Sequence, residues 1–164
     1  MTADSPLFDA EALETCLAPH RDAGRRIVFT NGCFDILHPG HVRLLQQARG
    51  FGDLLVLGLN SDESVHRLKG AGRPILNLVE RVQVLAALRP VDVLAAFDED
   101  NPLALIQRVR PAILVKGGDW TVDQVIGRAE VEGWGGRVEI IPLLEGLSTS
   151  ELLRRIKNGV GDEV

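Results

Sequence analysis

The sequence predicts an α/β fold, a doubly wound parallel sheet of five strands in a single domain, and three observations support this. At 164 residues the chain suffices for one domain with a sizeable core. Short apolar runs, typical of strands buried on both faces, alternate with segments of helical periodicity. Gly, Pro, Asn and Asp separate these segments. Such alternation indicates βα units with helices on both faces of the sheet.

The first expected elements have clear local signals. Asp9 can cap a short helix that reaches Leu17, and Pro19 is expected beyond its end. The apolar run in Arg26–Thr30 predicts the first strand. The spacing of apolar residues from Val42 to Arg49 predicts the helix that follows it.

The middle of the chain continues the same pattern. Asp53–Leu59 is a continuous apolar run and predicts a buried second strand. Asn60-Ser61-Asp62 can cap a helix that ends near Leu68. Two Gly, one Pro and two basic residues make Lys69–Asn77 a loop, and helical spacing returns over Leu78–Leu88.

The last third completes the alternation. Strands are expected where short apolar runs recur. Helices are expected where Pro or a capping box begins a segment of helical periodicity. Gly127 lowers the helix propensity of the segment that contains it. The expected elements are strand Val91–Ala95, a helix from Pro102 to Val109, strand Ile113–Lys116, a weak helix in Val122–Gly133, strand Arg137–Ile141 and a helix from Ser148 to Lys157.

The segment Thr30–His41 carries the clearest functional signal. It leaves a strand, turns through glycines and places two histidines at a helix start, where free backbone N–H groups favour phosphates. His38 and His41 are three apart and so share a helix face, and Gly40 leaves room for a phosphate. Imidazoles there can donate hydrogen bonds to a phosphate whose charge grows during reaction. The segment therefore predicts an enzyme acting on nucleotide phosphates, and its expected place is the carboxyl edge of the sheet where strand order reverses.

Composition excludes several other classes. The net charge is −5 without a basic run, so no nucleic-acid partner is expected. No apolar run approaches the roughly 20 residues of a membrane span, and no signal peptide is visible, so we expect a cytoplasmic protein. A zinc site at His38 and His41 is disfavoured. No further His, and neither Cys16 nor Cys33, supplies a third ligand at a spacing typical of zinc sites.

These residues resemble a known family. Thr30-Asn31-Gly32-x-Phe34-Asp35-x-x-His38-x-Gly40-His41 is similar to the signature of the cytidylyltransferase-like nucleotidyltransferases. Further segments over residues 24–157 resemble the D-glycero-β-D-manno-heptose 1-phosphate adenylyltransferases. They are Asn60-Ser61-Asp62, Arg67-Leu68-Lys69-Gly70, Arg73-Pro74, Glu80-Arg81, Val115-Lys116-Gly117-Gly118-Asp119 and Gly146-x-Ser148-Thr149.

The resemblance implies a fold and an activity. It implies a Rossmann-like domain over residues 25–164, with residues 1–24 as an N-terminal helical extension. The implied reaction transfers AMP from ATP, with Mg²⁺, to the sugar 1-phosphate; it yields ADP-heptose for lipopolysaccharide core assembly and releases pyrophosphate. Since no kinase sequence is present, a separate upstream heptose kinase and phosphatase are implied, and a homodimer is implied by resemblance alone.

The resemblance also implies roles for individual residues. It implies no protein side chain as a ligand of a metal ion. The catalytic set is His38, His41 and Lys116. The nucleotide-binding set is Thr30, Asn31, Gly32, Phe34, His38, Gly40, His41, Lys116, Gly117, Asp119, Ser148 and Thr149. The substrate-binding set is Asp35, Asn60, Lys69, Arg73 and Arg81.

Simpler roles remain open for several of these residues. Ser148 makes a capping box with Glu151, Arg81 could form a surface ion pair, and Asp35 could close its own loop. Lys116 could be a solvated strand end. Trp120 stands where the family commonly has Tyr, and either covers the site or packs against the loop.

Two other functions remain as alternatives. One is a glycerol-3-phosphate-type cytidylyltransferase, although the arginine typical of those relatives is absent from Leu143-Leu144-Glu145. The other is an inactive nucleotide-binding module. A dinucleotide oxidoreductase fits poorly, because no G-x-G-x-x-G opens the first helix after a strand.

Overall fold

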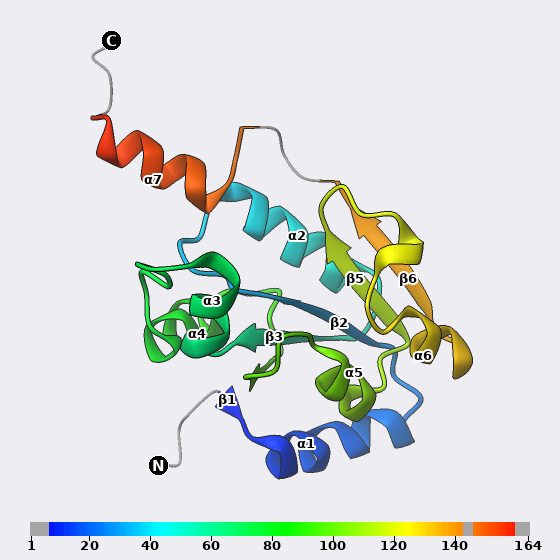
Figure 1. The fold of residues 1–164 in the computed structure, drawn as a ribbon. Helices are drawn as coiled ribbons and strands as arrows, with labels where there is room; N and C mark the ends of the chain where they lie inside the picture. Colours follow the sequence, from blue (N-terminus) through cyan, green and yellow to red (C-terminus); the bar gives the residue numbers. More distant parts are fainter. Residues whose placement is uncertain (1–6, 143–145, 160–164) are drawn as a thin grey trace.

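The computed structural model describes residues 7–142 and 146–159, which form one mixed α/β unit (Figure 1). Its strands are β1 (Leu7–Phe8), β2 (Ile27–Gly32), β3 (Leu54–Asn60), β4 (Val93–Phe97), β5 (Ile113–Gly117) and β6 (Arg137–Ile141). Its helices are α1 (Ala10–Asp22), α2 (Pro39–Gly50), α3 (Asp62–Lys69), α4 (Leu78–Ala86), α5 (Leu103–Val109), the 3-10 turn η1 (Val122–Gln124), α6 (Arg128–Gly133) and α7 (Thr149–Lys157).

The sheet is parallel throughout, with the order β1-β4-β3-β2-β5-β6. Strand order runs outward from β2 in both directions, so the reversal lies between β2 and β5. In register, Thr30 of β2 lies opposite Val115 of β5. The loops that follow these two strands therefore meet at the position where open α/β sheets bind ligands.

The predicted parallel α/β fold is confirmed, but the predicted count of five strands is wrong. The sixth is β1, whose two residues pair with Leu94 and Ala95 at the edge of the sheet. Two residues are too few to show a strand periodicity, so the sequence carried no signal for it. Helix α1 also continues to Asp22 with Pro19 inside it. Its last turn is held by Arg21, which donates to Glu14 and to the Arg108 carbonyl.

Two apolar cores cover the two faces of the sheet. On one face, side chains of α1 and α5 pack on alternate strand residues such as Phe29, Val56 and Leu114. On the other face, side chains of α2 and α4 pack on Val28, Leu57 and their neighbours. Figure 1 shows α2 on one side of the sheet and α1 with α5 on the opposite side. Residues that follow one another in a strand thus belong to different layers.

No helix in residues 7–142 and 146–159 combines the length and the apolar character that crossing a membrane requires.

Candidate active site

The two predicted histidines lie together where β2 passes into α2. His38 is the N-cap of α2, with an extended backbone, and Pro39 opens the helix. The His41 N–H donates to the His38 carbonyl at 2.9 Å. The two imidazole rings stack with centroids 3.8 Å apart and planes inclined by 27°. We call residues Cys33–His41 the histidine turn.

Glycines and a phenylalanine shape the space around the stacked rings. A Cβ atom on Gly40 would lie 2.9 Å from Cε1 of His38, so only glycine lets the ring take this position. Phe34 has a left-handed φ of 45°, and its ring centroid lies 5.0 Å from that of His41. A Cβ atom on Gly32 would come within 3.0 Å of the Phe34 ring. The glycines of the motif therefore make room for side chains of the site itself.

Buried polar atoms without a protein partner mark this turn as a ligand site. Among the described residues, Thr30 Oγ1, His38 Nδ1 and His41 Nδ1 are buried and accept or donate no hydrogen bond within the protein. Buried polar groups are normally paired, since leaving one unpaired costs about 1–3 kcal/mol. Three such atoms on one strand and the helix after it indicate a polar ligand.

Both histidines are neutral near pH 7. Burial lowers the pKa of His38, and burial together with the nearby His38 lowers the pKa of His41 to about 4. A second charge on stacked rings would be strongly disfavoured. Each neutral imidazole has one N–H donor. The two rings can therefore donate hydrogen bonds to a ligand without first being protonated.

Lys116 is the second-last residue of the neighbouring strand β5 and faces the other side of the sheet. Its Nζ lies 3.5 Å from Asn31 Oδ1 and 5.7 Å from the centroid of the Trp120 ring. Burial lowers its pKa, which nearby Lys69 lowers further and Cys33 partly restores. Asn31 thus lies next to the Lys116 ammonium, and Lys69 is near enough to affect its pKa.

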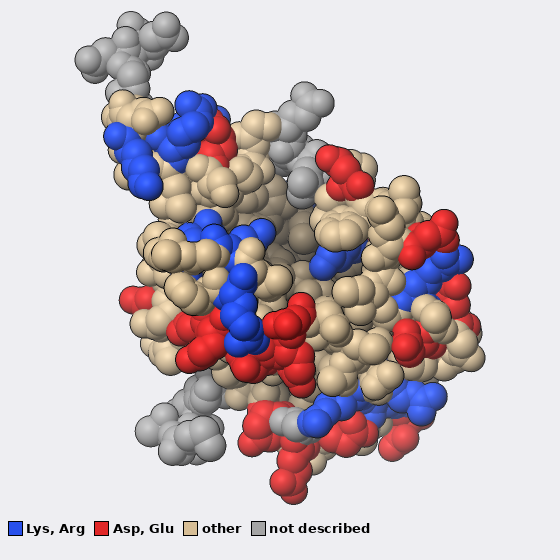
Figure 2. Space-filling model, viewed as in Figure 1, with Lys and Arg blue, Asp and Glu red and all other residues tan. Residues whose placement is uncertain are grey.

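A small hollow adjoins Lys116 on this face. Its walls are apolar with three polar side chains among them, and they comprise Asn31, Pro102, Leu114, Lys116, Trp120, Gln124, Val125 and Ile126. Sequence reasoning missed the contribution of η1, because only the break at Gly127 marked that segment. In Figure 2 the surface is hollowed near its middle, with Lys and Arg atoms on both sides. The hollow and the histidine pair flank the ends of β2 and β5 from opposite faces.

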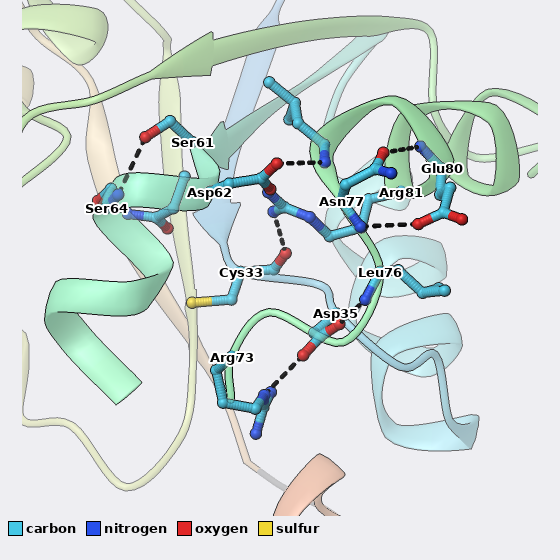
Figure 3. Close-up of polar contacts among 12 residues, drawn as sticks. Cys33, Asp35, Ser61, Asp62, Ser64, Arg73, Leu76, Asn77, Glu80 and Arg81 are labelled. Carbon is cyan, nitrogen blue, oxygen red and sulfur yellow. Dashed lines mark hydrogen bonds and ion pairs between the residues drawn. The ribbon is translucent and has the colours of Figure 1, made fainter. Parts of the chain in front are cut away.

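Two predicted substrate residues of the 60–81 region, Asn60 and Arg81, are buried and bonded to other residues of the protein. Asn60 donates to Ser64 Oγ, and Arg81, which is only 1% exposed, donates to the Cys33 carbonyl and to Asp62. Figure 3 shows the contacts of Arg81 next to Cys33 and Asp35 of the histidine turn. Direct contact of these residues with substrate stays a prediction. Lys69, in contrast, is exposed at the end of α3.

Asp35 is equally engaged within the protein. Its buried carboxylate accepts from Arg73 Nε at 2.6 Å and from the N–H groups of Ile75 and Leu76 at 2.9 Å. Burial alone would raise the pKa of Asp35, but these amides and Arg73 together hold it below its usual value. Asp35 thus fixes the histidine turn to a loop about 40 positions later, which differs from the expected closure of its own loop.

The start of α7 lies against the histidine turn. Ser148 caps the helix by accepting from the Glu151 N–H at 3.1 Å, and Thr149 Oγ1 donates to the Ile36 carbonyl at 3.3 Å. The Ser148 and Thr149 N–H groups, which a nine-residue helix leaves without intrahelical partners, are thereby brought near the turn. Gly117 ends β5, while Asp119 follows it exposed. Leu143-Leu144-Glu145 lies outside the described residues.

Comparison with known proteins finds relatives over nearly the whole chain. A family model described as cytidylyltransferase-like matches residues 29–155. The curated bifunctional protein HldE of Geobacter sulfurreducens is 52% identical over 160 residues, which are 98% of this chain and 33% of that protein. HldE of Syntrophotalea carbinolica is 54% identical over 153 residues, 93% of this chain and 31% of that protein. The chain thus spans about a third of the length of these curated relatives.

Solved structures show the same arrangement of strands and helices. A lipopolysaccharide core biosynthesis protein from Thermoplasma volcanium is 28% identical, with a TM-score of 0.60 over 74% of this chain and 98% of that one. A pantoate-β-alanine ligase from Francisella tularensis, 17% identical with a TM-score of 0.58 over 94% of this chain and 73% of that one, shares the fold alone.

Proposed function

The chain belongs to the cytidylyltransferase-like family and is a nucleotidyltransferase, and from that premise we propose that it transfers AMP from ATP to D-glycero-β-D-manno-heptose 1-phosphate. The products would be ADP-heptose and pyrophosphate. The observation that carries the proposal is the stacked pair His38–His41, whose buried Nδ1 atoms have no partner in the protein.

The reaction needs charge stabilisation rather than a covalent intermediate. An oxygen of the sugar phosphate attacks the α-phosphorus of ATP, the new P–O bond forms, and the bond from the α-phosphorus to the bridging oxygen breaks in line. The electron pair leaves with pyrophosphate. Neutral His41 would donate to the α-phosphate as its charge grows, and His38 would reach the same phosphate chain.

Cationic and backbone groups complete the proposed site. Lys116, at the strand end beside the turn, would grip a phosphate while the Gly117 backbone lies along the adenine. Ser148 and Thr149 at the start of α7 would hold the β- and γ-phosphates through hydroxyl and N–H groups. ATP would enter with Mg²⁺ on its own phosphate oxygens. The described residues contain no group of three His, Cys, Asp or Glu side chains suited to hold the ion.

The hollow beside Lys116 suits the sugar phosphate. Gln124 can bind hydroxyls and the half-exposed Trp120 can pack on a sugar ring, while Lys116 and Asn31, assigned above to the nucleotide, line the same hollow. Lys69, exposed at the end of α3, would reach the acceptor, whereas a contact of Arg73 with substrate would have to coexist with its pairing to Asp35. The Thermoplasma neighbour, by its title a lipopolysaccharide core biosynthesis protein, supports a sugar acceptor over glycerol phosphate.

The acceptor and nucleotide are tested together. Purified protein is mixed with ATP, CTP or GTP and with heptose 1-phosphate or glycerol 3-phosphate, and pyrophosphate release is measured with mass detection of the product. We expect rapid release with ATP and heptose phosphate only. CTP with glycerol phosphate as the best pair would select the cytidylyltransferase alternative, and no release with any pair would select the inactive module.

The chemistry of the substrate indicates which reactions must precede this one. We propose that a kinase step and a phosphatase step supply the sugar 1-phosphate. A homodimer in the cytoplasm completes the proposal, and sedimentation of the purified protein would test the dimer.

A further inference from the structure

We infer that Arg81 is a positioning residue: from inside α4 it fixes the backbone of the histidine turn and so holds the Phe34 ring behind His41. The inference concerns the same site as the proposed function and rests on it. It assigns Arg81 a role different from the substrate contact that the sequence suggested.

Arg81 is buried, and both terminal nitrogens of its guanidinium donate to protein acceptors, while its Nε has no partner among the described residues. The side chain is 1% exposed, Nη1 donates to the Cys33 carbonyl at 2.7 Å, and Nη2 donates to Asp62 Oδ1 at 2.7 Å. A planar guanidinium can hold two acceptors in a fixed relation, and charged hydrogen bonds of this length are strong. Figure 3 shows Arg81 between Asp62 and the Cys33 carbonyl. Arg81 therefore links the start of α3 to the histidine turn.

The turn needs such support because its backbone is strained. Phe34 adopts a φ of 45°, which is unusual for a bulky residue and persists only where surrounding contacts enforce it. Arg81 holds the carbonyl before Phe34. On the other side, the Asp35 carboxylate is held by Arg73 and by the N–H groups of Ile75 and Leu76. One segment, residues 73–81, thus clamps both neighbours of Phe34.

The strained turn determines what lies behind His41. The Phe34 ring centroid is 5.0 Å from the His41 ring, inclined by 40°, and the ring is itself buried. If the Cys33 carbonyl is released, Phe34 can relax to the ordinary β region, and its ring then leaves this position. His41 would lose a wall, gain water and move from its alignment with the phosphate. A misplacement of about 1 Å can cost roughly 10²-fold in turnover.

The test compares two substitutions with a matched control. Arg81→Lys keeps the charge but cannot bridge both acceptors, and Arg81→Met removes both contacts; Arg89→Met alters an exposed arginine just beyond α4. We expect both Arg81 variants to lose about 10²-fold in kcat with little change in the KM values. A variant with normal kcat and a raised KM for the sugar phosphate would instead identify a direct substrate contact and overturn the inference.

A second readout needs no substrate and so is independent of the proposed reaction. NMR titration of the His41 imidazole should show a pKa near 4 in the wild type and in Arg89→Met. In folded Arg81→Lys it should move toward 6.5, because water replaces the Phe34 wall. An unchanged His41 titration in that variant would overturn the inference even if the enzyme used another nucleotide.

Asp62→Asn separates positioning from simple loss of stability. It weakens the outer contact of Arg81 but leaves the donor to the Cys33 carbonyl, so the protein should unfold more easily while His41 titrates as in the wild type. A His41 shift as large as that of Arg81→Lys would contradict the role given to the Cys33 contact. This variant also keeps the test open if Arg81→Met does not fold.

Discussion

Replacing His41 by Asn should change both the activity and the acid stability of the protein, by amounts that the structure sets. Burial and the neighbouring His38 lower the pKa of His41 to about 4 in the folded protein. In the unfolded chain a histidine titrates near 6.5. Between these pH values the unfolded chain binds a proton at His41 that the folded protein does not, so the stability of the wild type rises with pH across this window.

The size of the effect follows from the same two values. His41 should cost the wild type about 3 kcal/mol of unfolding free energy as pH falls from above 6.5 to 4. His41→Asn lacks the titrating group and should show a correspondingly shallower acid limb. Titratable groups distant from the stacked pair contribute equally in both proteins, so they cancel in the difference.

Urea denaturation followed by tryptophan fluorescence measures this difference at steps from pH 4 to 7.5. At neutral pH the same variant should lose about 10²–10³-fold in turnover, because the shorter Asn amide does not place its donor where the imidazole would reach the reacting phosphate. His66→Asn, at an exposed histidine of α3, is the control and should keep wild-type turnover. Parallel stability curves for the wild type and His41→Asn would refute the buried neutral imidazole, and unchanged turnover would refute its part in the chemistry.

Three further substitutions test separate parts of the site. Lys116→Met should reduce turnover by about 10²-fold or more in the pyrophosphate assay while the circular dichroism stays native, since it removes a cation at the end of β5; near-normal turnover would mean that no phosphate contacts this side chain. Gly40→Ala should lower kcat by up to about 10²-fold, because the added Cβ would lie 2.9 Å from Cε1 of His38 and displace the ring; the assay contradicts this if kcat is retained. Ser148→Ala should destabilise the start of α7 by about 1 kcal/mol and raise the KM for ATP; amide exchange and initial rates report the two effects, and an unchanged KM would leave Ser148 as a cap only.

The histidine turn could be predicted from the sequence because its determinants are local. A strand, two glycines and a helix start within twelve residues leave few backbone paths, and His38 and His41 do stack at the beginning of α2. The meeting of this turn with the end of β5 also followed, since parallel strands place successive carboxyl ends on one edge.

Residues whose partners are distant could not be assigned in the same way. The contacts of Asp35 come from a loop about 40 positions later in the chain, and no pattern near Asp35 announces them. Arg81 did carry a signal. It falls on the buried stripe of α4 with Leu78, Val82 and Leu85, at the spacing of one helix face, so an interior role could have been expected. The edge strand β1 was too short to leave any periodic trace.

The fate of labelled phosphorus tests the central proposal most directly. The protein is incubated with heptose 1-phosphate and ATP labelled at either the α- or the γ-phosphorus, and the products are separated. The proposal predicts that the α-label appears in the sugar nucleotide and the γ-label in pyrophosphate. Transfer of the γ-label to the sugar, or retention of both labels in ATP, would contradict it.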